Sequence, residues 1–379
     1  MAEEATIRTG LVFDERYLQH NPGLKVLPNG EAYPWVEPEL HWSNHRLVQR
    51  TKQLIDLSGI SAYLKLLPPR MASLEEIERF HTPGYVARVE RLCIEGGGDA
   101  GQGAPVNAGS FEVARLAAGG ALTAVEAVYT DEVRRAFALI RPPGHHAVAN
   151  LGMGFCVFNN VVLAALHARE VFGAERIVIV DWDVHNGNGT QQAFYNDRGV
   201  LFFSIHQDRL YPSDSGLLEQ DGEGDGKGFT VNIPLPAGSG DAAYLALFDE
   251  LILPVIDAYE PDLILVSAGQ DASIMDQLGR MCLTTEAYRR MTSLMINRAE
   301  RHALGKLVIL QEGGYSETYG PYATLAIIET LAGSHAELPE PLPYERIVAQ
   351  PHHSEVGPSA RTAIDAAIEH YKQYWDTLG

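Results

Sequence analysis

Five short apolar runs, each followed at once by polar or glycine-rich residues, dominate the pattern of this chain. They are FALI (137–140), IVIV (177–180), VLFFSI (200–205), LILV (263–266) and LVIL (307–310). Each run is rich in Val, Ile, Leu or Phe and lacks alternation between apolar and polar positions, which is typical of parallel strands buried on both faces. The pattern therefore predicts five strands of a parallel sheet.

Helical patterns lie between several of these runs. The segments with helical periodicity cover residues 111–129, 159–172, 241–259 and 284–304. Strands and helices that alternate in this way predict an α/β layered fold. One further amphipathic helix is expected near the C-terminal end, at about 359–377.

The organisation of the 379 residues indicates one unit, because there is no internal repeat and the main changes of composition lie at the two ends. We therefore expect a single domain over 1–379. Residues 20–45 combine Pro, Gly and Trp without periodicity, which predicts a long ordered loop, and such loops are often functional. Residues 336–358 are rich in Pro. Neither segment has the character of a separate domain.

The charge of the chain is strongly acidic, with 49 Asp and Glu against 29 Lys and Arg and a formal net charge of −20. An acidic surface repels nucleic-acid phosphates and attracts cations, so we expect no direct nucleic-acid partner. A surface that is acidic only for solubility would carry the same charge. The opening MAEEATIRTG is acidic and no apolar run reaches about 18 residues. We therefore expect no secretory signal, no membrane association and a cytoplasmic location.

The candidate chemistry gathers where the predicted strands end. The three cysteines, Cys93, Cys156 and Cys282, are too scattered for a disulfide framework or a thiolate zinc site, so a metal must use His and carboxylates. Ligands of open parallel sheets bind beyond the carboxyl ends of the strands. The residues expected to converge on that rim are His145, His146, Asp181, Asp183, His185, Asp271 and Tyr315.

Each of these clusters also has an ordinary structural explanation. Gly-His-His fits a solvated turn, Asp-x-Asp-x-His fits a helix cap, and Gly-Gly-Tyr fits a tight turn with a packing aromatic. Their joint occurrence on one rim favours an active site over these separate explanations.

The residue types and their spacing predict a metal centre. Asp183 and His185 lie two residues apart, which places both on the same side of extended backbone, while Asp181 lies deeper in the strand. Asp271, at the end of another strand, can supply a third ligand. Catalytic zinc takes three ligands from His and carboxylate and keeps one position open. Such an ion acts as a Lewis acid on a carbonyl.

The remaining rim residues supply the other groups that amide hydrolysis needs. His145 and His146 are general acid and base groups that titrate near neutrality. Tyr315 can donate its hydroxyl to a developing oxyanion. No serine or cysteine nucleophile is required. Together these parts predict hydrolysis of a linear amide with the help of a bound zinc ion.

At this point the motifs carry a resemblance to a known family. The blocks are RPPGHHA (141–147), GFCVFNN (154–160), DWDVHNGNGTQ (181–191), SAGQDAS (267–273) and QEGGYS (311–316). They resemble the signature blocks of the histone deacetylase family, and most closely its class II branch and the bacterial histone deacetylase-like and acetylpolyamine amidohydrolases. The resemblance runs in order over about 75–330, with FHTPGYVARV (80–89) as a weaker early block.

The resemblance implies an arginase/deacetylase fold, which is a single α/β domain with a central parallel sheet of about eight strands between helices. It also implies roles at matching positions. The zinc ligands would be Asp183, His185 and Asp271, and Tyr315 would polarise the scissile carbonyl. His146 would act as the main base and acid with Asn188 behind it, and His145 as an electrostatic partner with Asp181 behind it.

Substrate and ion positions follow from the same resemblance. Gly154, Phe155 and Tyr211 match residues that line an acyl-lysine tunnel, and Asp99 matches a rim aspartate that holds the substrate backbone. Potassium would bind near the zinc through the Ser204 side chain and the backbone carbonyls of Asp181, Asp183 and His185.

Two positions depart from the family pattern, and several alternatives stay open. Asn186 replaces a second His after the ligand, and Gln270 stands where class II members usually carry Phe; neither removes a ligand.

An arginase-like two-metal site is disfavoured because it needs more Asp and His ligands. Acyl-lysine peptides are the favoured substrates, with acetylated polyamines as the alternative, and a weak member that binds or senses acylated ligands is a more distant one. A homo-oligomer also stays open.

Overall fold

The centre of the computed structural model is one eight-stranded sheet in which every neighbouring pair of strands is parallel. In spatial order the strands are β10 (Thr230–Leu235), β9 (Val200–Gln207), β8 (Ile177–Asp181), β11 (Leu263–Ala268), β12 (Leu307–Gln311), β6 (Arg135–Ala138), β1 (Thr9–Val12) and β2 (Leu64–Leu67). The structure describes residues 9–25, 34–336, 338, 341–342 and 344–379. The predicted fold class and the expected strand number are confirmed.

All five predicted strands are present, as β6, β8, β9, β11 and β12. Strand β6 begins two residues earlier than predicted and ends at Ala138, although Leu139 and Ile140 beyond it are also buried. The sequence pattern missed β1, β2 and β10. Strands β1 and β2 have four residues each, and β10 contains Asn232 and Pro234. Proline is tolerated in β10 because this strand lies at the edge of the sheet.

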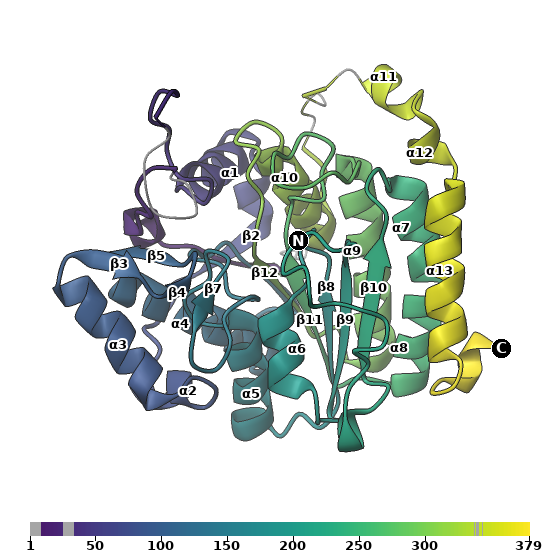
Figure 1. Cartoon of the computed structure of the whole chain (residues 1–379), viewed down its shortest axis with the longest axis horizontal. Helices are drawn as coiled ribbons and strands as arrows, with labels where there is room; N and C mark the ends of the chain where they lie inside the picture. The colour runs from purple at the N-terminus through teal and green to yellow at the C-terminus, as the bar shows by residue number, and fades with distance from the viewer. Residues whose placement is uncertain (1–8, 26–33, 337, 339–340, 343) are drawn as a thin grey trace, which may run out of the picture.

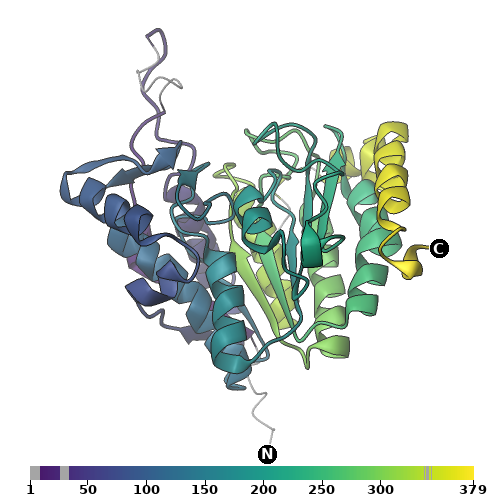
Figure 2. The ribbon, with the colours of Figure 1, turned by 60° about the horizontal axis from the view of Figure 1, so that its bottom comes forward.

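Helices cover both faces of the sheet, as Figures 1 and 2 show. Crossovers between parallel strands are right-handed, so the direction of each crossover selects the face on which its helix lies. One face carries α4 (Ser110–Tyr129), α5 (Asn160–Phe172) and the short α6 (Asn188–Phe194). The other carries α1 (Arg46–Leu57), α7 (Asp241–Leu247), α8 (Leu253–Tyr259), α9 (Thr285–His302) and α10 (Gly320–Ala332).

Three of the four predicted internal helices, α4, α5 and α9, agree with the structure. The fourth, predicted as one helix over 241–259, is divided into α7 and α8 by a π-helical turn at Phe248–Ile252. Pro254 explains the division, because it lacks the N–H that a continuous α-helix needs at this position.

The C-terminal helix α13 (Pro358–Tyr371) packs along the edge strand β10, as the yellow helix in Figure 1 shows. It is shorter than the predicted 359–377, and a 3₁₀ turn at Asp376–Leu378 follows it. Two short helices precede it, α11 (Tyr344–Val348) and α12 (Pro351–Ser354). Among the described residues, no helix combines the length and apolar character that crossing a membrane requires.

A smaller layer beside α4 forms the approach to the rim of the sheet. It contains α2 (Leu74–Glu78), α3 (Pro83–Ile94), the antiparallel pair β3 (Gly97–Asp99) and β5 (Pro105–Asn107), and the parallel pair β4 (Gly101–Gln102) and β7 (Gly152–Met153). Residues 26–33 of the predicted loop at 20–45 lie outside the described residues. On either side of them, Leu24 and Leu40 form an antiparallel bridge.

Candidate active site

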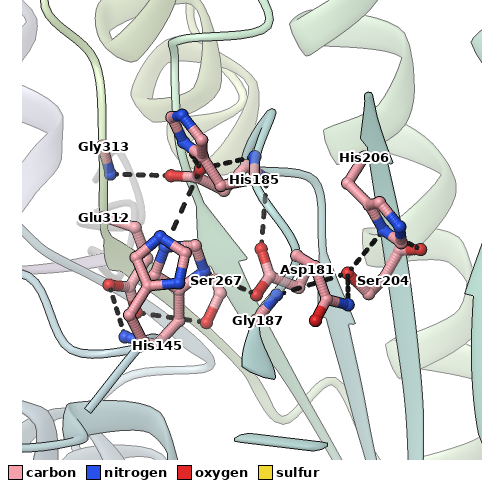
Figure 3. A network of polar contacts seen from close by, with 12 residues as sticks. His145, Asp181, His185, Gly187, Ser204, His206, Ser267, Glu312 and Gly313 are labelled. Atoms are coloured by element: carbon pink, nitrogen blue, oxygen red, sulfur yellow. Dashed lines mark hydrogen bonds and ion pairs between the residues drawn. The ribbon is translucent and has the colours of Figure 1, made fainter. Parts of the chain in front are cut away.

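The loops after β6, β8, β11 and β12 meet at the carboxyl ends of the four strands in the middle of the sheet. Figure 3 shows residues from the strands β8, β9 and β11 and from the segments after β6, β8 and β12 close together in one polar network. The predicted convergence on one rim is present in the structure, because Asp183, His185 and Asp271 form one group and His185 lines one cavity together with His146 and Tyr315.

Asp183, His185 and Asp271 form a buried group in which one ligand atom of each lies within 4.8 Å of the others. His185 Nδ1 lies 3.0 Å from Asp183 Oδ1 and 3.1 Å from Asp271 Oδ2. The other carboxylate oxygens accept backbone N–H groups, from Gly313 to Asp183 at 2.9 Å and from Val184 to Asp271 at 2.9 Å. These bonds fix the orientation of both carboxylates.

The local backbone brings Asp183 and His185 together in a different way from the predicted strand alternation. Strand β8 ends at Asp181, and Asp183 Oδ1 then accepts the backbone N–H of His185 at 3.0 Å. Asp181 makes a similar contact, accepting the N–H of Asp183 at 3.1 Å. Short polar side chains favour such turns. The expected proximity is correct, but a turn produces it.

The electrostatics of this trio fit a cation. Burial and the charge of Asp183 raise the pKa of Asp271 to about 8. Burial opposes the charged form of His185, yet hydrogen bonds to Asp183 and Asp271 raise its pKa to about 10. Two buried carboxylates and one imidazole are a donor set suited to a divalent ion. The charge of such an ion would relieve the repulsion between the Asp183 and Asp271 carboxylates. The residues therefore fit the expected metal.

His146 is arranged as a neutral base. Its Nδ1–H donates to Asn188 Oδ1 at 2.8 Å, and the Asn188 amide nitrogen donates to the His146 carbonyl at 3.3 Å. Burial lowers the pKa of His146 well below its usual range, and the nearby His145 and His185 rings lower it further. The imidazole is therefore neutral at pH 7, with its Nε2 lone pair available.

His145 has the opposite character. Its Nδ1 lies 2.9 Å from Asp181 Oδ2 and its Nε2 lies 3.8 Å from Asp183 Oδ1. Burial opposes protonation, but the charges of Asp183 and Asp181 outweigh burial and raise the pKa of His145 well above its usual range. The two rings are 4.0 Å apart between centroids. One site thus holds a charged and a neutral histidine side by side.

Tyr315 lies on the turn after β12. Its backbone N–H donates to Asp276 Oδ2 at 2.6 Å, and so does the N–H of Ser316 at 3.1 Å. Burial, followed by the charges of Asp271 and Asp183, raises the pKa of the Tyr315 phenol well above its usual range. The hydroxyl therefore stays protonated and can act as a hydrogen-bond donor.

A cavity of about 520 Å³ leads to these groups. Its lining residues are Gln102, Gly103, His146, Gly154, Phe155, His185, Leu210, Tyr211, Leu278 and Tyr315. The predicted tunnel residues Gly154, Phe155 and Tyr211 all belong to this lining. A Cβ atom at Gly154 would lie 2.4 Å from His146 Cδ2, and φ there is +49°, so only glycine fits beside the base.

Asp99 has a structural role in the turn at 99–104, which borders the cavity at Gly103. Its carboxylate accepts the backbone N–H groups of Gly101, Gly103 and Ala104 at 2.8, 3.0 and 2.9 Å. It thereby shapes the turn that presents Gly103 to the cavity, and Asp99 itself is not among the lining residues. Its contact with a substrate backbone remains a prediction.

Ser204 lies on β9 beside β8, and Figure 3 shows it next to His206. The Ser204 hydroxyl lies 3.0 Å from His206 Nδ1 and accepts the Asn186 amide N–H at 3.1 Å. Asn186 also donates to Asn232 Oδ1 and accepts from the Ser215 hydroxyl. Asn186, the first of the two positions that depart from the family pattern, therefore forms a buried link among β9, β10 and the loop at 215.

Gln270, the second departure, faces away from the cavity. Its amide N–H donates to the Ala268 carbonyl at 2.8 Å, and its carbonyl oxygen accepts the Gln311 amide N–H. Gln311 also donates to the Gly313 carbonyl at 3.0 Å. The pair supports the turns that carry Asp271 and Tyr315. Gln270 does not belong to the tunnel lining.

Glu312 is a buried acid that the sequence analysis did not single out, although it stands inside the QEGGYS block. Its Oε2 accepts the N–H groups of Gly144 at 2.7 Å and His145 at 3.2 Å, and its Oε1 accepts the Ser267 hydroxyl at 3.2 Å. Burial raises its pKa to about 7. Asp276, which positions Tyr315, was also missed. A carboxylate directly after a buried strand was the available signal for Glu312.

Comparison with known proteins agrees with this geometry. The histone deacetylase domain model matches residues 41–331. The chain is 42% identical over 342 residues to the histone deacetylase-like amidohydrolase of Pseudomonas aeruginosa, with 89% of each chain covered. It is 44% identical over 329 residues to a probable deacetylase of Archaeoglobus fulgidus, with 86% of each covered.

A solved structure shows the same arrangement. The crystal structure of the HDA15 HD domain superposes on this chain with a TM-score of 0.86 and 29% sequence identity. The match covers 99% of this chain and 97% of the HDA15 chain. The predicted family resemblance is thus confirmed by sequence and by fold. This chain belongs to the histone deacetylase family of hydrolases.

Proposed function

We propose that this chain is a zinc-dependent deacetylase that removes acetyl or related acyl groups from acylated amines, with acyl-lysine peptides as its main substrates. The observation that carries the proposal is the cavity itself. It has apolar and aromatic walls, and it ends at a neutral His146, a protonated Tyr315 and the metal-ligand residue His185. A flexible alkyl chain fits such a slot.

Asp183, His185 and Asp271 would hold the zinc ion. When bound there, zinc supplies Lewis-acid polarisation of the substrate carbonyl and makes a water molecule more acidic. The hydrogen bonds that orient the two carboxylates come from the backbone of Gly313 and Val184. Such supporting contacts keep ligands in a productive orientation.

His146 would move the proton. Because its Nδ1–H is engaged by Asn188, its Nε2 accepts the proton of the attacking water and later returns it to the departing amine nitrogen. A charged His145 keeps the pKa of this base low and adds positive charge near the reacting centre. The Tyr315 hydroxyl donates to the carbonyl oxygen as negative charge develops on it.

The cavity walls favour acyl-lysine over polyamine substrates. The lining drawn from the described residues contains no Asp or Glu, and Leu210, Leu278 and Phe155 contribute apolar surface. A lysine side chain presents only methylene groups between its amide and its backbone, whereas a polyamine carries further ammonium groups that need polar partners. The net charge of −20 favours the polyamine alternative, because it attracts polycations.

We also propose a potassium ion beside the end of β8, held by the Ser204 hydroxyl and the backbone carbonyls of Asp181, Asp183 and His185. The burial of Ser204 and its position opposite Asp181 in the pairing of β9 with β8 support this site. Replacing potassium by a large organic cation in the buffer should lower the melting temperature, and Ser204→Ala should reduce that response.

The test of the proposal is acetate release from an acetyl-lysine peptide by the zinc-loaded chain. Activity should disappear on chelation and return with zinc, with one equivalent bound per chain by elemental analysis. Asp183→Ala should lose both metal and turnover. Full activity of a preparation without detectable metal would overturn the mechanism.

The substrate class needs a second comparison. The value of kcat/KM for an acetyl-lysine peptide should exceed that for acetylputrescine and acetylspermidine. A preference of more than about tenfold for the polyamines, about 1.4 kcal/mol in transition-state binding, would reverse the assignment.

A further inference from the structure

The segment beyond residue 33 reaches the back of the tunnel wall. The His41 ring meets the Phe155 ring edge to face, with centroids 4.7 Å apart and planes at 86°. Phe155 in turn meets Tyr315 edge to face at 5.8 Å. Phe155 and Tyr315 line the cavity, whereas His41 does not. His41 therefore stands behind the wall that touches the substrate chain.

The His41 ring is held in one orientation. Its Nδ1 accepts the backbone N–H of Ser43 at 3.1 Å, and its carbonyl accepts the Asn44 amide N–H at 2.9 Å. The backbone N–H of His41 donates to the Gly23 carbonyl at 3.0 Å. Burial lowers the pKa of His41 to about 4. The residue is thus a neutral, buried aromatic ring with a fixed tautomer.

A buried arginine ties this segment to the active-site turn. Arg141 lies four residues before His145 and is 3% exposed. Its guanidinium donates to the carbonyls of Tyr17 and His20 and, at 2.7 Å, to that of Ser43. Because charge-assisted bonds of this kind are strong, the backbone around His41 keeps a fixed position relative to the catalytic histidines.

The backbone of Phe155 is also fixed, so its ring position depends on its neighbours. Its φ is +71°, an uncommon conformation for a bulky residue, and its N–H donates to the Gly103 carbonyl at 2.7 Å. With the backbone held, the ring can retreat from the cavity only by rotating into space behind it. The His41 ring packs against Phe155 there.

We propose that His41 determines substrate specificity by holding Phe155 against the substrate chain and so setting the width of the tunnel. This proposal rests on the proposed function, which identifies the substrate chain as an acylated lysine side chain. Without the His41 ring, Phe155 gains room to rotate, and chains thicker than a row of methylene groups can enter. His41 is a positioning residue, since it acts through Phe155.

Two substitutions separate the ring from its hydrogen bond. His41→Asn removes the ring and keeps an acceptor for the Ser43 N–H, whereas His41→Phe keeps a ring and loses the acceptor. Trp35→Ala is the matched control, because it removes a ring from the same segment at a residue that is 94% exposed. Melting temperatures establish that each variant is folded.

The readout is a ratio of kcat/KM values for two peptides, one with acetyl-lysine and one with an acetylated 4-(aminomethyl)phenylalanine at the same position. His41→Asn should shift the ratio about tenfold towards the aromatic chain, while His41→Phe and Trp35→Ala stay within about twofold of wild type. An unchanged ratio in His41→Asn, or the same shift in His41→Phe, overturns the proposal.

A binding measurement separates this proposal from the proposed function. Dissociation constants of an alkyl and a benzyl hydroxamic acid, measured by calorimetry with the zinc-loaded chain, need no turnover. If wild type hydrolyses neither peptide, the proposed function fails, and the ratio of these constants still tests His41. His41→Asn should shift the ratio of the two dissociation constants about tenfold in favour of the benzyl compound. A ratio of dissociation constants equal to that of wild type contradicts the role of His41.

Discussion

The amide oxygen of Asn188 accepts the Nδ1–H of His146 at 2.8 Å, while the carboxylate of Asp181 faces Nδ1 of His145 at 2.9 Å. The partner behind each ring therefore differs in charge, and this difference contributes to the different protonation states of the two rings. Burial and the charge of His145 lower the pKa of His146, and the hydrogen bond to the neutral Asn188 amide raises it only in part. The charges of Asp183 and Asp181 outweigh burial and hold a proton on His145.

Asn188→Asp tests this relationship directly. A carboxylate behind His146 favours the imidazolium form and raises the pKa of His146, so the neutral base is lost at a higher pH than in wild type. The acidic limb of the pH profile of kcat/KM should move upward by about one unit or more. An acidic limb at the wild-type position would show that His146 is not the titrating base.

Replacement of the two histidines should have unequal effects. His146→Ala removes the group that accepts and returns the proton, so kcat should fall by about 100- to 10,000-fold while the metal content stays at the wild-type level. His145→Ala should cost less, because it removes only a charge beside the site. If His145→Ala is the more severe change, the two roles must be exchanged.

Tyr315→Phe removes one hydroxyl from an otherwise packed ring. The phenyl ring keeps its contacts with Phe155 and His185, so the melting temperature should not change. Loss of an oxyanion donor typically costs about 100- to 1000-fold in kcat. A variant within about threefold of wild type would mean that Tyr315 only packs against the tunnel wall.

The rim could be predicted from the sequence because its residues follow directly after the apolar runs of β6, β8, β11 and β12. Parallel strands bring such positions to one edge whatever their separation in the chain. The contacts that support these residues could not be predicted in this way. Glu312 bonds to Gly144 and His145 across 168 and 167 positions, and no local pattern encodes such a contact. Strand β10, with Asn232 and Pro234 inside it, likewise lacks the apolar pattern.

Glu312→Gln tests whether this support acts through geometry or charge. The Gln carbonyl can still accept the two backbone N–H groups, and its amide can donate to Ser267, so the fold should persist. The folded-state pKa of Glu312 is raised to about 7 from an ordinary value near 4.5. An acid whose pKa is raised on folding loses stability as pH rises between those two values.

The expected outcome is therefore a stability difference that depends on pH. In metal-depleted protein, Glu312→Gln should gain stability relative to wild type between pH 5 and pH 8, by at most about 3 kcal/mol, since one pKa unit corresponds to about 1.4 kcal/mol. Unfolding by urea at several pH values measures it. A constant difference across this range would contradict a raised pKa for Glu312.

The Gln270 and Gln311 pair gives a last prediction, on stability. Gln311→Leu leaves the Gln270 carbonyl oxygen and the Gly313 carbonyl without their buried donor, which should cost about 1–3 kcal/mol. Gln270→Leu should cost less, because the Gln311 amide keeps the Gly313 carbonyl as an acceptor. In the double variant neither glutamine is left without its partner, whereas each single variant leaves one of them so. The double variant should therefore lose less stability than the sum of the two single ones, by about 1 kcal/mol in a urea-unfolding cycle. Additive losses would show that the two side chains are independent supports of their turns.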